Sequence, residues 1–208
     1  YYDKYLNWNK LKHMKLLVKS LFLIVISIFL FSCSQKEKTQ NYVKIEPDDT
    51  LQEIVRKSNR VVPSERQYRW QTYEFIAFLH YGVNTYTGNE WGSGEEDPAV
   101  FHPTAFDAGQ WISVIKDAGM ELAMLTAKHH DGFCLWPTGY TDHSVMGSSW
   151  RNGGGDVVGE LAESCRKHGL NLGLYLSPWD QHEPVYGKQQ TYNEFYLAQL
   201  RELLTRYG

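Results

Sequence analysis

The sequence predicts an α/β fold with a parallel sheet, and the form that we favour is the first part of a TIM-like (β/α)8 barrel. From residue 75 onward, three strand-like apolar runs alternate with three helix-like segments, and a glycine ends each helix. Such repeats join parallel strands through right-handed crossovers. A doubly wound sheet fits the same pattern. Residues suited to chemistry follow all three strands, however, whereas an open sheet concentrates its site at one switch point, so the barrel is favoured.

The first unit begins with a short apolar run over residues 75–79 that ends at His80. After a long loop, Asp107 is placed to cap a helix, with Gln110 three residues further on. Apolar residues then recur at helical spacing until Gly119, and glycine commonly ends helices. These signals predict one strand followed by one helix.

The second unit contains the stretch of the chain that is richest in reactive side chains, residues 126–137, which reads TAKHHDGFCLWP. The apolar run before it, residues 122–125, is compact enough for a buried strand, and Gly132 lets the chain turn where the polar residues begin. Asp156 can cap the following helix, and Gly169 can end it. We therefore expect these polar side chains at the carboxyl end of a strand, where α/β folds keep their sites.

The third unit is a predicted strand over residues 170–176 and a helix that we expect to start at a capping box of Thr191 and Glu194 and to run to Gly208. A complete barrel has eight such units in about 250 residues. Residues 61–208 hold three units. The next strand of a barrel would follow this helix within about 2 to 6 residues. We therefore expect the chain to be the front part of a longer protein, with a truncated barrel.

The N-terminal segment predicts export. The first methionine is Met14, so residues 1–13 resemble translated upstream sequence. Residues 14–32 contain two lysines and then an apolar stretch that is too short to cross a bilayer of about 30 Å as a helix. This is the pattern of a secretory signal peptide rather than of a membrane-spanning helix.

Cys33 follows Leu-Phe-Ser, which resembles the bacterial lipoprotein box, in which the cysteine is lipidated and becomes the first residue. An ordinary cleaved signal peptide is the alternative. Residues 33–60 are polar and charged, which suits a tether. We expect an exported protein of the bacterial periplasm or outer membrane that is attached to the membrane by an N-terminal lipid anchor.

The charge balance argues against nucleic acid as a partner. Residues 1–32 hold five of the 21 basic and one of the 24 acidic residues, so their removal leaves 16 against 23. A chain with this negative balance lacks the basic surface that binds phosphate backbones. Of the remaining cysteines, Cys134 and Cys165, the sequence leaves open whether they form a disulfide or stay as two buried thiols.

Polar and aromatic side chains that follow the predicted strands form a candidate site. Histidine can donate a hydrogen bond from one ring nitrogen and accept one at the other, and aromatic rings pack on the C–H face of a sugar. A sugar therefore suits this mixture of side chains. The set comprises His80, Glu90, Trp91, His129, His130, Asp131, Tyr175, Trp179 and Asp180.

Metal binding is the rival interpretation of the histidines, and we expect neither a metal nor a cofactor. Adjacent residues on a strand point to opposite faces, so His129 and His130 converge only where the strand has ended. No H-x-H, H-E-x-x-H or C-x-x-C spacing is present. A nucleophilic Cys134 would have to meet His130, four residues away on a turn. We expect structural hydrogen bonds for the other histidines, namely His102, His143, His168 and His182.

Six short motifs, taken in order, resemble the N-terminal half of the catalytic barrel of the α-L-fucosidases of glycoside hydrolase family 29. The resemblance spans about residues 61–208. The segments WGSGEEDP and LYLSPWD are similar to sequences of the branch of the family that prefers α-1,3/1,4-linked fucose. The motifs are FLHYG at 78–82, EWG at 90–92, TAKHHDGFCLWP at 126–137, SV at 144–145, GDVV at 155–158 and GLYLSPWD at 173–180.

The resemblance implies an exo-acting, retaining enzyme that removes terminal fucose from fucosylated glycans. It also implies that an aspartate at the end of the fourth strand is the nucleophile and that a later carboxylic acid is the acid/base. Both would lie beyond Gly208, so we expect no catalytic residue in this chain and expect the fragment alone to be inactive. A non-catalytic fucose-binding protein and, less well supported, a metal-dependent hydrolase are the alternatives. The residues implied to line the fucose subsite are His80, Glu90, Trp91, His129, His130 and Tyr175.

Overall fold

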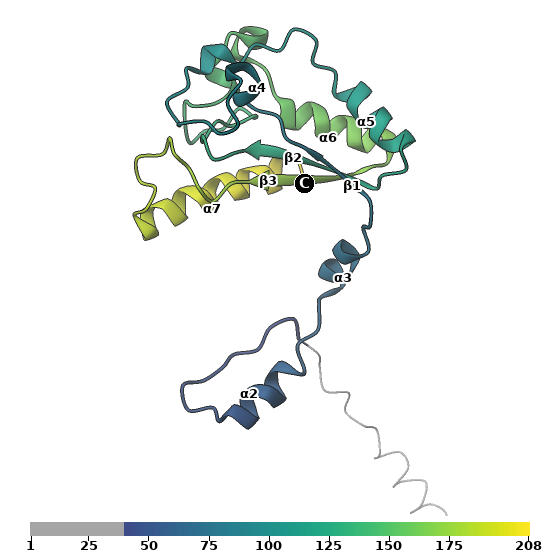
Figure 1. The fold of residues 1–208 in the computed structure, drawn as a ribbon, viewed down its shortest axis with the longest axis vertical. Coiled ribbons are helices and arrows are strands. Elements are labelled where there is room, and N and C mark those ends of the chain that lie inside the picture. Colours follow the sequence, from purple (N-terminus) through teal and green to yellow (C-terminus); the bar gives the residue numbers. More distant parts are fainter. Residues whose placement is uncertain (1–39) are drawn as a thin grey trace, which may run out of the picture. The chain divides into compact units, whose positions relative to one another are not determined.

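A computed structural model of the chain describes residues 40–208, in two compact units (Figure 1). One unit ends at Tyr68, and the other runs from Arg69 to Gly208. Residues 14–32 and Cys33, to which we assign the signal and the lipid anchor, lie outside the described residues. No helix within residues 40–208 combines the length and the apolar character needed to cross a membrane.

Helix α2 (Leu51–Ser58) lies in the part of the first unit that the structure describes. Thr50 caps it in a reciprocal box with Glu53, in which each side chain bonds the backbone N–H of the other residue. An isolated β-bridge pairs Gln40 with Val61. The polar segment that we expect to act as a tether thus includes a capped helix. A second short helix, α3 (Glu65–Gln71), spans the division between the units.

Three parallel strands form the sheet of the second unit, in the order β1–β2–β3. They are β1 (Ile76–Leu79), β2 (Leu122–Lys128) and β3 (Asn171–Leu176). This confirms the α/β class and the parallel sheet. Strand β2 runs three residues beyond the predicted end at Leu125, so Thr126, Ala127 and Lys128 belong to the strand and not to the turn. The sequence does not indicate this extension, because polar residues begin inside the strand.

Helices α5 (Ala108–Asp117) and α6 (Val157–His168) begin where predicted. The Asp107 carboxylate accepts the N–H of Gln110 at 3.0 Å, and the Asp156 carboxylate accepts the N–H of Gly159 at 2.7 Å. Gly169 adopts the left-handed conformation that ends α6, with φ at 63°. The sequence therefore encodes both helix starts through their caps.

Helix α7 (Gln189–Arg206) differs from the prediction. It begins two residues before Thr191, so Thr191 and Glu194 lie inside the helix and the predicted capping box is wrong. The N–H of Tyr192 already bonds the carbonyl of Lys188, and Lys188 gives no side-chain cap. A capping signal is local and weak, and the tertiary contacts of this helix decide where it starts.

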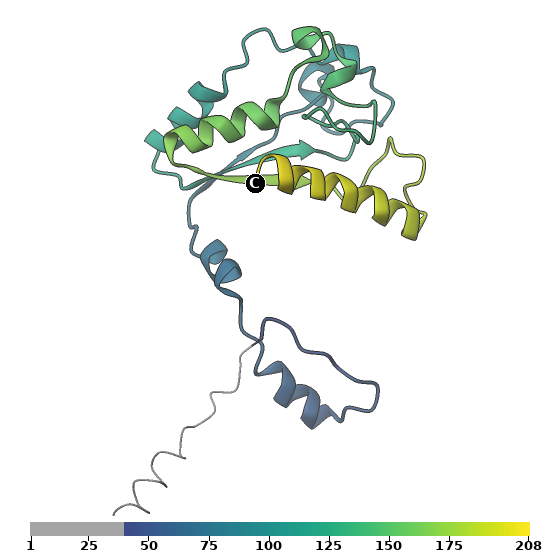
Figure 2. The same cartoon turned by 180° about the vertical axis from the view of Figure 1, so that it is seen from behind.

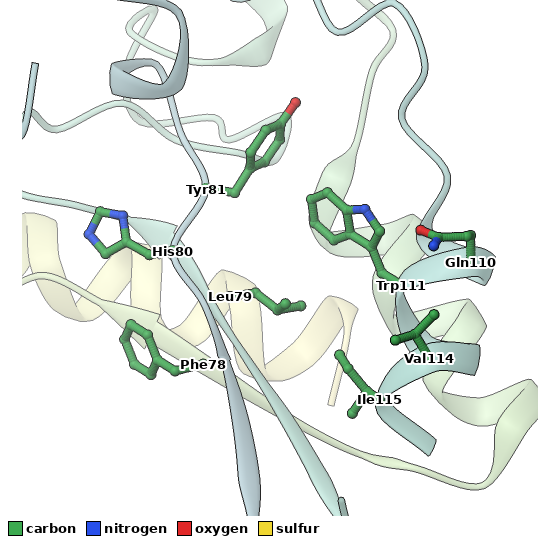
Figure 3. Close-up of a pocket in the computed structure, with 8 residues that line it drawn as sticks. All are labelled: Phe78, Leu79, His80, Tyr81, Gln110, Trp111, Val114 and Ile115. Carbon is green, nitrogen blue, oxygen red and sulfur yellow. The ribbon is translucent and has the colours of Figure 1, made fainter. Parts of the chain in front are cut away.

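The three helices cover one face of the sheet. Leu79, Leu125 and Leu174 share one register row, and Leu79 points toward α5 (Figure 3). Leu174 lines a groove with Leu200 of α7. In Figures 1 and 2, α5 and α6 lie side by side against the sheet, and α7 runs along β3. The next register row points to the opposite face, where the Phe78 side chain is 52% exposed.

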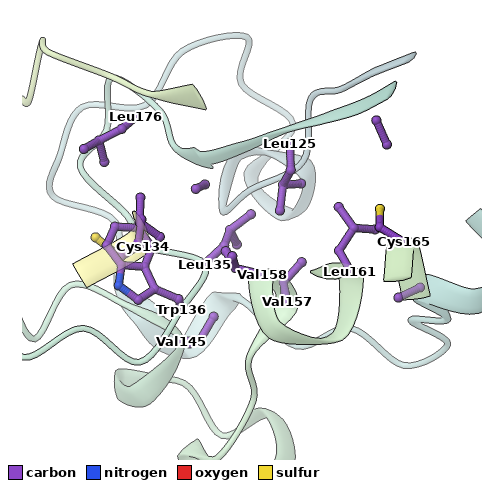
Figure 4. Close-up of a cluster of buried hydrophobic side chains, with 14 of the residues drawn as sticks. Leu125, Cys134, Leu135, Trp136, Val145, Val157, Val158, Leu161, Cys165 and Leu176 are labelled. Atoms are coloured by element: carbon purple, nitrogen blue, oxygen red, sulfur yellow. The ribbon is translucent and has the colours of Figure 1, made fainter. Parts of the chain in front are cut away.

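The main core lies between β2 and α6 (Figure 4). Leu125, Leu135 and Leu161 are 0% exposed. Cys134 and Cys165 belong to the same cluster as two free, buried thiols, which settles the alternative that the sequence leaves open. This core fixes the carboxyl end of β2, from which the candidate site extends.

Candidate functional site

Three of the six predicted site residues, His80, His129 and His130, follow strands, and their rings form one cluster with that of Tyr175. The ring centroids of His80 and His129 are 4.4 Å apart, and those of His129 and His130 are 4.0 Å apart. The Tyr175 ring, near the end of β3, lies 6.2 Å from His129. Parallel strands place their carboxyl ends at one edge of the sheet, which is why residues nearly 100 positions apart meet.

Trp91 joins this cluster from the long loop between β1 and α5. Its ring lies 5.5 Å from His130 and 5.6 Å from Trp179, with an edge-to-face geometry in both pairs. Trp179 itself lies 4.7 Å from His130. The structure thus brings together five of the six predicted residues and adds Trp179, which the strand-end argument identifies but the resemblance does not.

Glu90 is the predicted residue that the structure does not join to the cluster. Its side chain is exposed, and among residues 40–208 it takes part in none of the hydrogen bonds, ion pairs or ring contacts. It precedes Trp91 in the same loop, so the backbone holds it near the site. Its assignment to the sugar site stays a prediction.

Strand alternation directs His80 into the site. Figure 3 shows Phe78 and His80 on one side of β1, and Leu79 and Tyr81 on the side of α5. Phe78 lies 6.2 Å from the Tyr175 ring across the open face of the sheet. The aromatic surface therefore continues from the strand ends onto that face.

His129 is held as a neutral ring. Burial is the main reason that its pKa falls to about 4, and the neighbouring His130 and His80 add to the effect. Its Nδ1 atom is buried without a hydrogen-bond partner. A buried polar atom without a partner is costly, so this nitrogen is an energetic cost within the cluster.

The two aspartates near the cluster have structural roles. Asp131 is 2% exposed, and its carboxylate accepts the N–H of Phe133 at 2.7 Å and the side-chain amide of Asn84 at 2.9 Å. Burial raises its pKa. Asp180 is 1% exposed and accepts the backbone N–H groups of His182 and Glu183. Both carboxylates are thus engaged in hydrogen bonds within the protein.

Lys128 is the feature that sequence reasoning missed most clearly. Its ammonium is fully buried, 2.7 Å from the Asp180 carboxylate and 2.9 Å from the Gln199 side-chain oxygen. Rings of α7 surround it, with the Phe195 centroid at 5.3 Å. A lysine next to a buried apolar strand needs a partner of opposite charge, and on this ground the sequence could have indicated the ion pair. Lys128 therefore ties β2 to α7 and to the loop that carries Trp179.

Two loops of the site are bonded to each other. The Gln181 side-chain amide donates to the Gly92 carbonyl at 2.9 Å, and His182 Nδ1 lies 2.6 Å from the Gly94 carbonyl. A Cβ on Gly94 would lie 2.5 Å from the backbone of Gln181, so only glycine permits this approach. These contacts hold the Trp91 loop against the loop after β3. No sequence motif marks them.

Three of the four histidines expected to make structural hydrogen bonds, His102, His168 and His182, do so. His102 Nδ1 lies 2.6 Å from the Val100 carbonyl, and His168 Nδ1 lies 2.9 Å from the Ser164 carbonyl. His143 differs, because its Nε2 atom is buried without a partner and its ring stacks on His182 at 4.0 Å.

The Cys134 thiol is not available as a nucleophile. It is 0% exposed, donates to the Gly132 carbonyl and accepts the Gln199 amide, and burial raises its pKa. Within residues 40–208, no three histidine, cysteine or carboxylate side chains gather as metal ligands would.

Comparison with known proteins identifies the family of this chain. A sequence model of the α-L-fucosidase family matches residues 61–208. Alpha-L-fucosidase 1 of Arabidopsis thaliana is 57% identical over 147 residues, which are 71% of this chain and 29% of that protein. The chain thus spans less than a third of the length of this relative.

Solved structures agree. A glycoside hydrolase 29 family member from an unknown rumen bacterium matches with a TM-score of 0.68 and 56% identity, over 71% of this chain and 26% of that one. A family 29 fucosidase of Ruminococcus gnavus, solved in complex with fucose, matches with a TM-score of 0.64 and 35% identity, over 82% of this chain and 35% of that one. The chain therefore belongs, over residues 61–208, to the α-L-fucosidases of glycoside hydrolase family 29.

Proposed function

We propose that the protein that carries this chain is an exo-acting, retaining α-L-fucosidase that removes terminal fucose from fucosylated glycans. The observation that carries the proposal is the ring cluster at the carboxyl ends of the three strands. It combines three histidines, which exchange hydrogen bonds with hydroxyl groups, with the faces of Trp91 and Tyr175, on which a sugar ring packs.

The proposed roles follow from the chemistry of each group. His80, His129 and His130 bind fucose hydroxyls, and the support for this role is that their three rings gather at the strand ends. Such bonds strengthen as the sugar ring flattens toward an oxocarbenium-like transition state. Glu90 and Tyr175 complete the subsite in this proposal.

The catalytic carboxylates are proposed to lie outside these 208 residues. The reaction needs a nucleophile and an acid/base about 5 Å apart. Asp131 and Asp180, which follow β2 and β3, are buried and bonded to the protein. The family relationship implies an aspartate after a fourth strand and an acid on a later loop.

We also propose that the sheet is one part of a (β/α)8 barrel. Strands β1 and β3 are both sheet edges, and an apolar hollow lies beside each. One hollow of about 460 Å³ lies between β1 and α5 (Figure 3), and the other, of about 170 Å³, lies between β3 and α7. Further β/α units of a barrel would cover both edges and close the open face into an interior.

The linkage that we propose is α-1,3 or α-1,4. Its support is the sequence of the loop 91–98 and of residues 174–180, which resembles that branch of the family. In the structure the Trp91 and Trp179 rings of these two segments lie 5.6 Å apart, and Gln181 and His182, directly after the second segment, contact Gly92 and Gly94 of the first. The segments that carry the branch signature therefore border the ring cluster.

The experiment is a turnover assay of the full-length protein on α-1,2-, α-1,3- and α-1,4-fucosylated oligosaccharides and on an aryl fucoside. We expect release of fucose with retained configuration from the 1,3 and 1,4 linkages, detected by NMR of the first-formed product. Tight fucose binding without any turnover would instead show a non-catalytic fucose-binding protein. Activity abolished by a chelator and restored by metal would show a metal-dependent hydrolase.

We further propose that the protein is exported and anchored through a lipid on Cys33. The support is the sequence of residues 14–33 alone. Replacing the cysteine, Cys33→Ser, should move the protein from the membrane fraction to the soluble fraction or stall its processing. Unchanged fractionation would contradict the lipid anchor and favour a plain signal peptide.

A further inference from the structure

Ser177, the first residue after β3, links two members of the ring cluster. Its side chain is 0% exposed. Its hydroxyl oxygen lies 2.8 Å from Nδ1 of His130, 2.6 Å from the carbonyl oxygen of Trp179 and 3.2 Å from the backbone nitrogen of Trp179. One buried hydroxyl thus makes three hydrogen bonds.

The directions of these three bonds are determined by the hydrogens available. A hydroxyl has one hydrogen and two acceptor sites. The Trp179 carbonyl carries no hydrogen, so at 2.6 Å it must receive the hydrogen of Ser177. The Trp179 N–H fills one acceptor site. His130 Nδ1 must fill the other as a donor, because Ser177 has no second hydrogen to give.

A neutral imidazole has one N–H, so a hydrogen on Nδ1 leaves Nε2 as a bare acceptor. A half-turn of the His130 ring would place Cδ2 instead of Nδ1 beside Ser177 and lose this hydrogen bond, and smaller turns are opposed by the packing of the ring. It lies 4.0 Å from His129 and 4.7 Å from Trp179, and its backbone carbonyl accepts the N–H of Gln181 at 2.9 Å.

We infer that Ser177 is a positioning residue that holds neutral His130 in the Nδ1–H form and so presents Nε2 as an acceptor to the sugar. The ligand group that meets His130 must then be a hydrogen-bond donor, as a hydroxyl is. A carbonyl or ether oxygen at the same place would face a lone pair. This inference rests on the proposed function only for the identity of the ligand, because the tautomer follows from contacts within the chain.

The first test measures the tautomer directly in the full-length protein without substrate. The ¹⁵N shifts of labelled His130, assigned from their loss in a His130→Gln variant, report which ring nitrogen carries hydrogen. We expect a protonated Nδ1 and a bare Nε2 when the ring is neutral. A neutral ring with hydrogen on Nε2 would overturn the inference.

The second test removes the hydroxyl. In Ser177→Ala, His130 should show a mixture of both neutral forms, and kcat/KM should fall about 2- to 10-fold, the worth of one neutral hydrogen bond. Ser164→Ala is the matched control, because Ser164 is a buried serine on α6 whose hydroxyl has no partner within residues 40–208. Ser164→Ala should change neither the tautomer of His130 nor kcat/KM. An unchanged tautomer in Ser177→Ala would refute the inference.

Fucose addition separates this inference from the proposed function. A shift of the His130 Nε2 signal on adding fucose supports the sugar site, whichever tautomer is found. A correct tautomer without any response to fucose would confirm the role of Ser177 and contradict the binding role of His130. If Ser177→Ala does not fold, the wild-type spectrum still decides the tautomer.

Discussion

Burial determines the charge of His129, which the sequence alone does not predict. Its pKa falls to about 4, so at neutral pH it exchanges hydrogen bonds without carrying charge. A charged ring would repel the neighbouring His80 and His130. The ring centroids of His80 and His130 can therefore lie 4.4 and 4.0 Å from that of His129 because burial keeps His129 neutral.

Replacing any one of the three cluster histidines with alanine should lower kcat/KM of the full-length protein by about 10- to 1,000-fold, or about 1.4 to 4 kcal/mol. The reason is the loss of a hydrogen bond that is strongest in the transition state. His168→Ala is the control, because His168 ends α6 and bonds the Ser164 carbonyl. It should cost a few tenths of a kcal/mol in stability and leave kinetics unchanged. The reverse pattern would show that the site is elsewhere.

His143 predicts a pH dependence of stability. Burial, with help from the stacked His182, lowers its pKa to about 4. The unfolded chain therefore binds a proton first, so this histidine contributes full stability above about pH 6.5 and loses it as the pH falls toward 4. In His143→Phe, which keeps a ring in the stack, the free energy of unfolding should decline less between pH 7 and pH 5. Equal slopes in urea titrations would contradict this.

At the scale of elements, the turn after β2 combines a backbone demand with a packing demand. Gly132 has φ at +80°, a conformation that L side chains rarely adopt. A Cβ there would also lie 2.4 Å from the Asp180 carboxylate and 2.8 Å from the Cβ of His182. Gly119, after α5, has nearly the same φ at +81° but open space around it.

These two glycines form a matched pair for measuring how much the close contacts around Gly132 contribute to the cost of adding a side chain. Gly119→Ala should cost about 1 to 2 kcal/mol through backbone strain alone. Gly132→Ala should cost clearly more and should also reduce kcat/KM, because the same turn carries His129 and His130. The measurement is urea unfolding together with kinetics of both variants. Equal costs would mean that the loop after β3 moves aside without loss.

The buried ion pair of Lys128 and Asp180 links β2 to the loop after β3. Lys128→Met leaves a buried carboxylate without its cation and should lower the free energy of unfolding by about 3 to 5 kcal/mol. Glu163→Gln tests an exposed pair of similar length, to Arg166 at 2.7 Å, and should change stability by less than about 1 kcal/mol. If both changes had similar effects in thermal unfolding, α7 would not depend on this link.

At the scale of the whole molecule, the 208-residue chain exposes surface that a closed barrel would bury. Phe78 on the open face is 52% exposed, and Leu197 and Leu204 of α7 are 57% and 65% exposed. Apolar surface and free strand edges of this kind promote association between chains.

We therefore expect the 208-residue chain, expressed alone, to be poorly soluble and inactive on fucosides. Sedimentation and a turnover assay, with the full-length protein as the reference, check both points. Turnover by the pure chain would show that the catalytic carboxylates lie within it, and a soluble monomer would contradict the proposed barrel. Turnover would also contradict the structural roles of Asp131 and Asp180.

The sequence by itself determined the parallel α/β class, the starts of α5 and α6, and the approximate places of all three strands. These features depend on local signals, namely apolar runs, aspartate caps and glycine stops, which act over a few residues. The same reasoning was wrong at the start of α7 and at the end of β2, where contacts with distant parts of the chain override local preference.

Only the tertiary structure decided which of the candidate residues meet. It joined Trp179 and Ser177 to the histidines, left Glu90 exposed, and showed Lys128 and Asp180 to be a buried pair. Sequence spacing cannot supply these facts, because hydrogen-bond partners, burial and pKa depend on groups 40 to 90 residues apart that the fold of the sheet brings within a few ångströms.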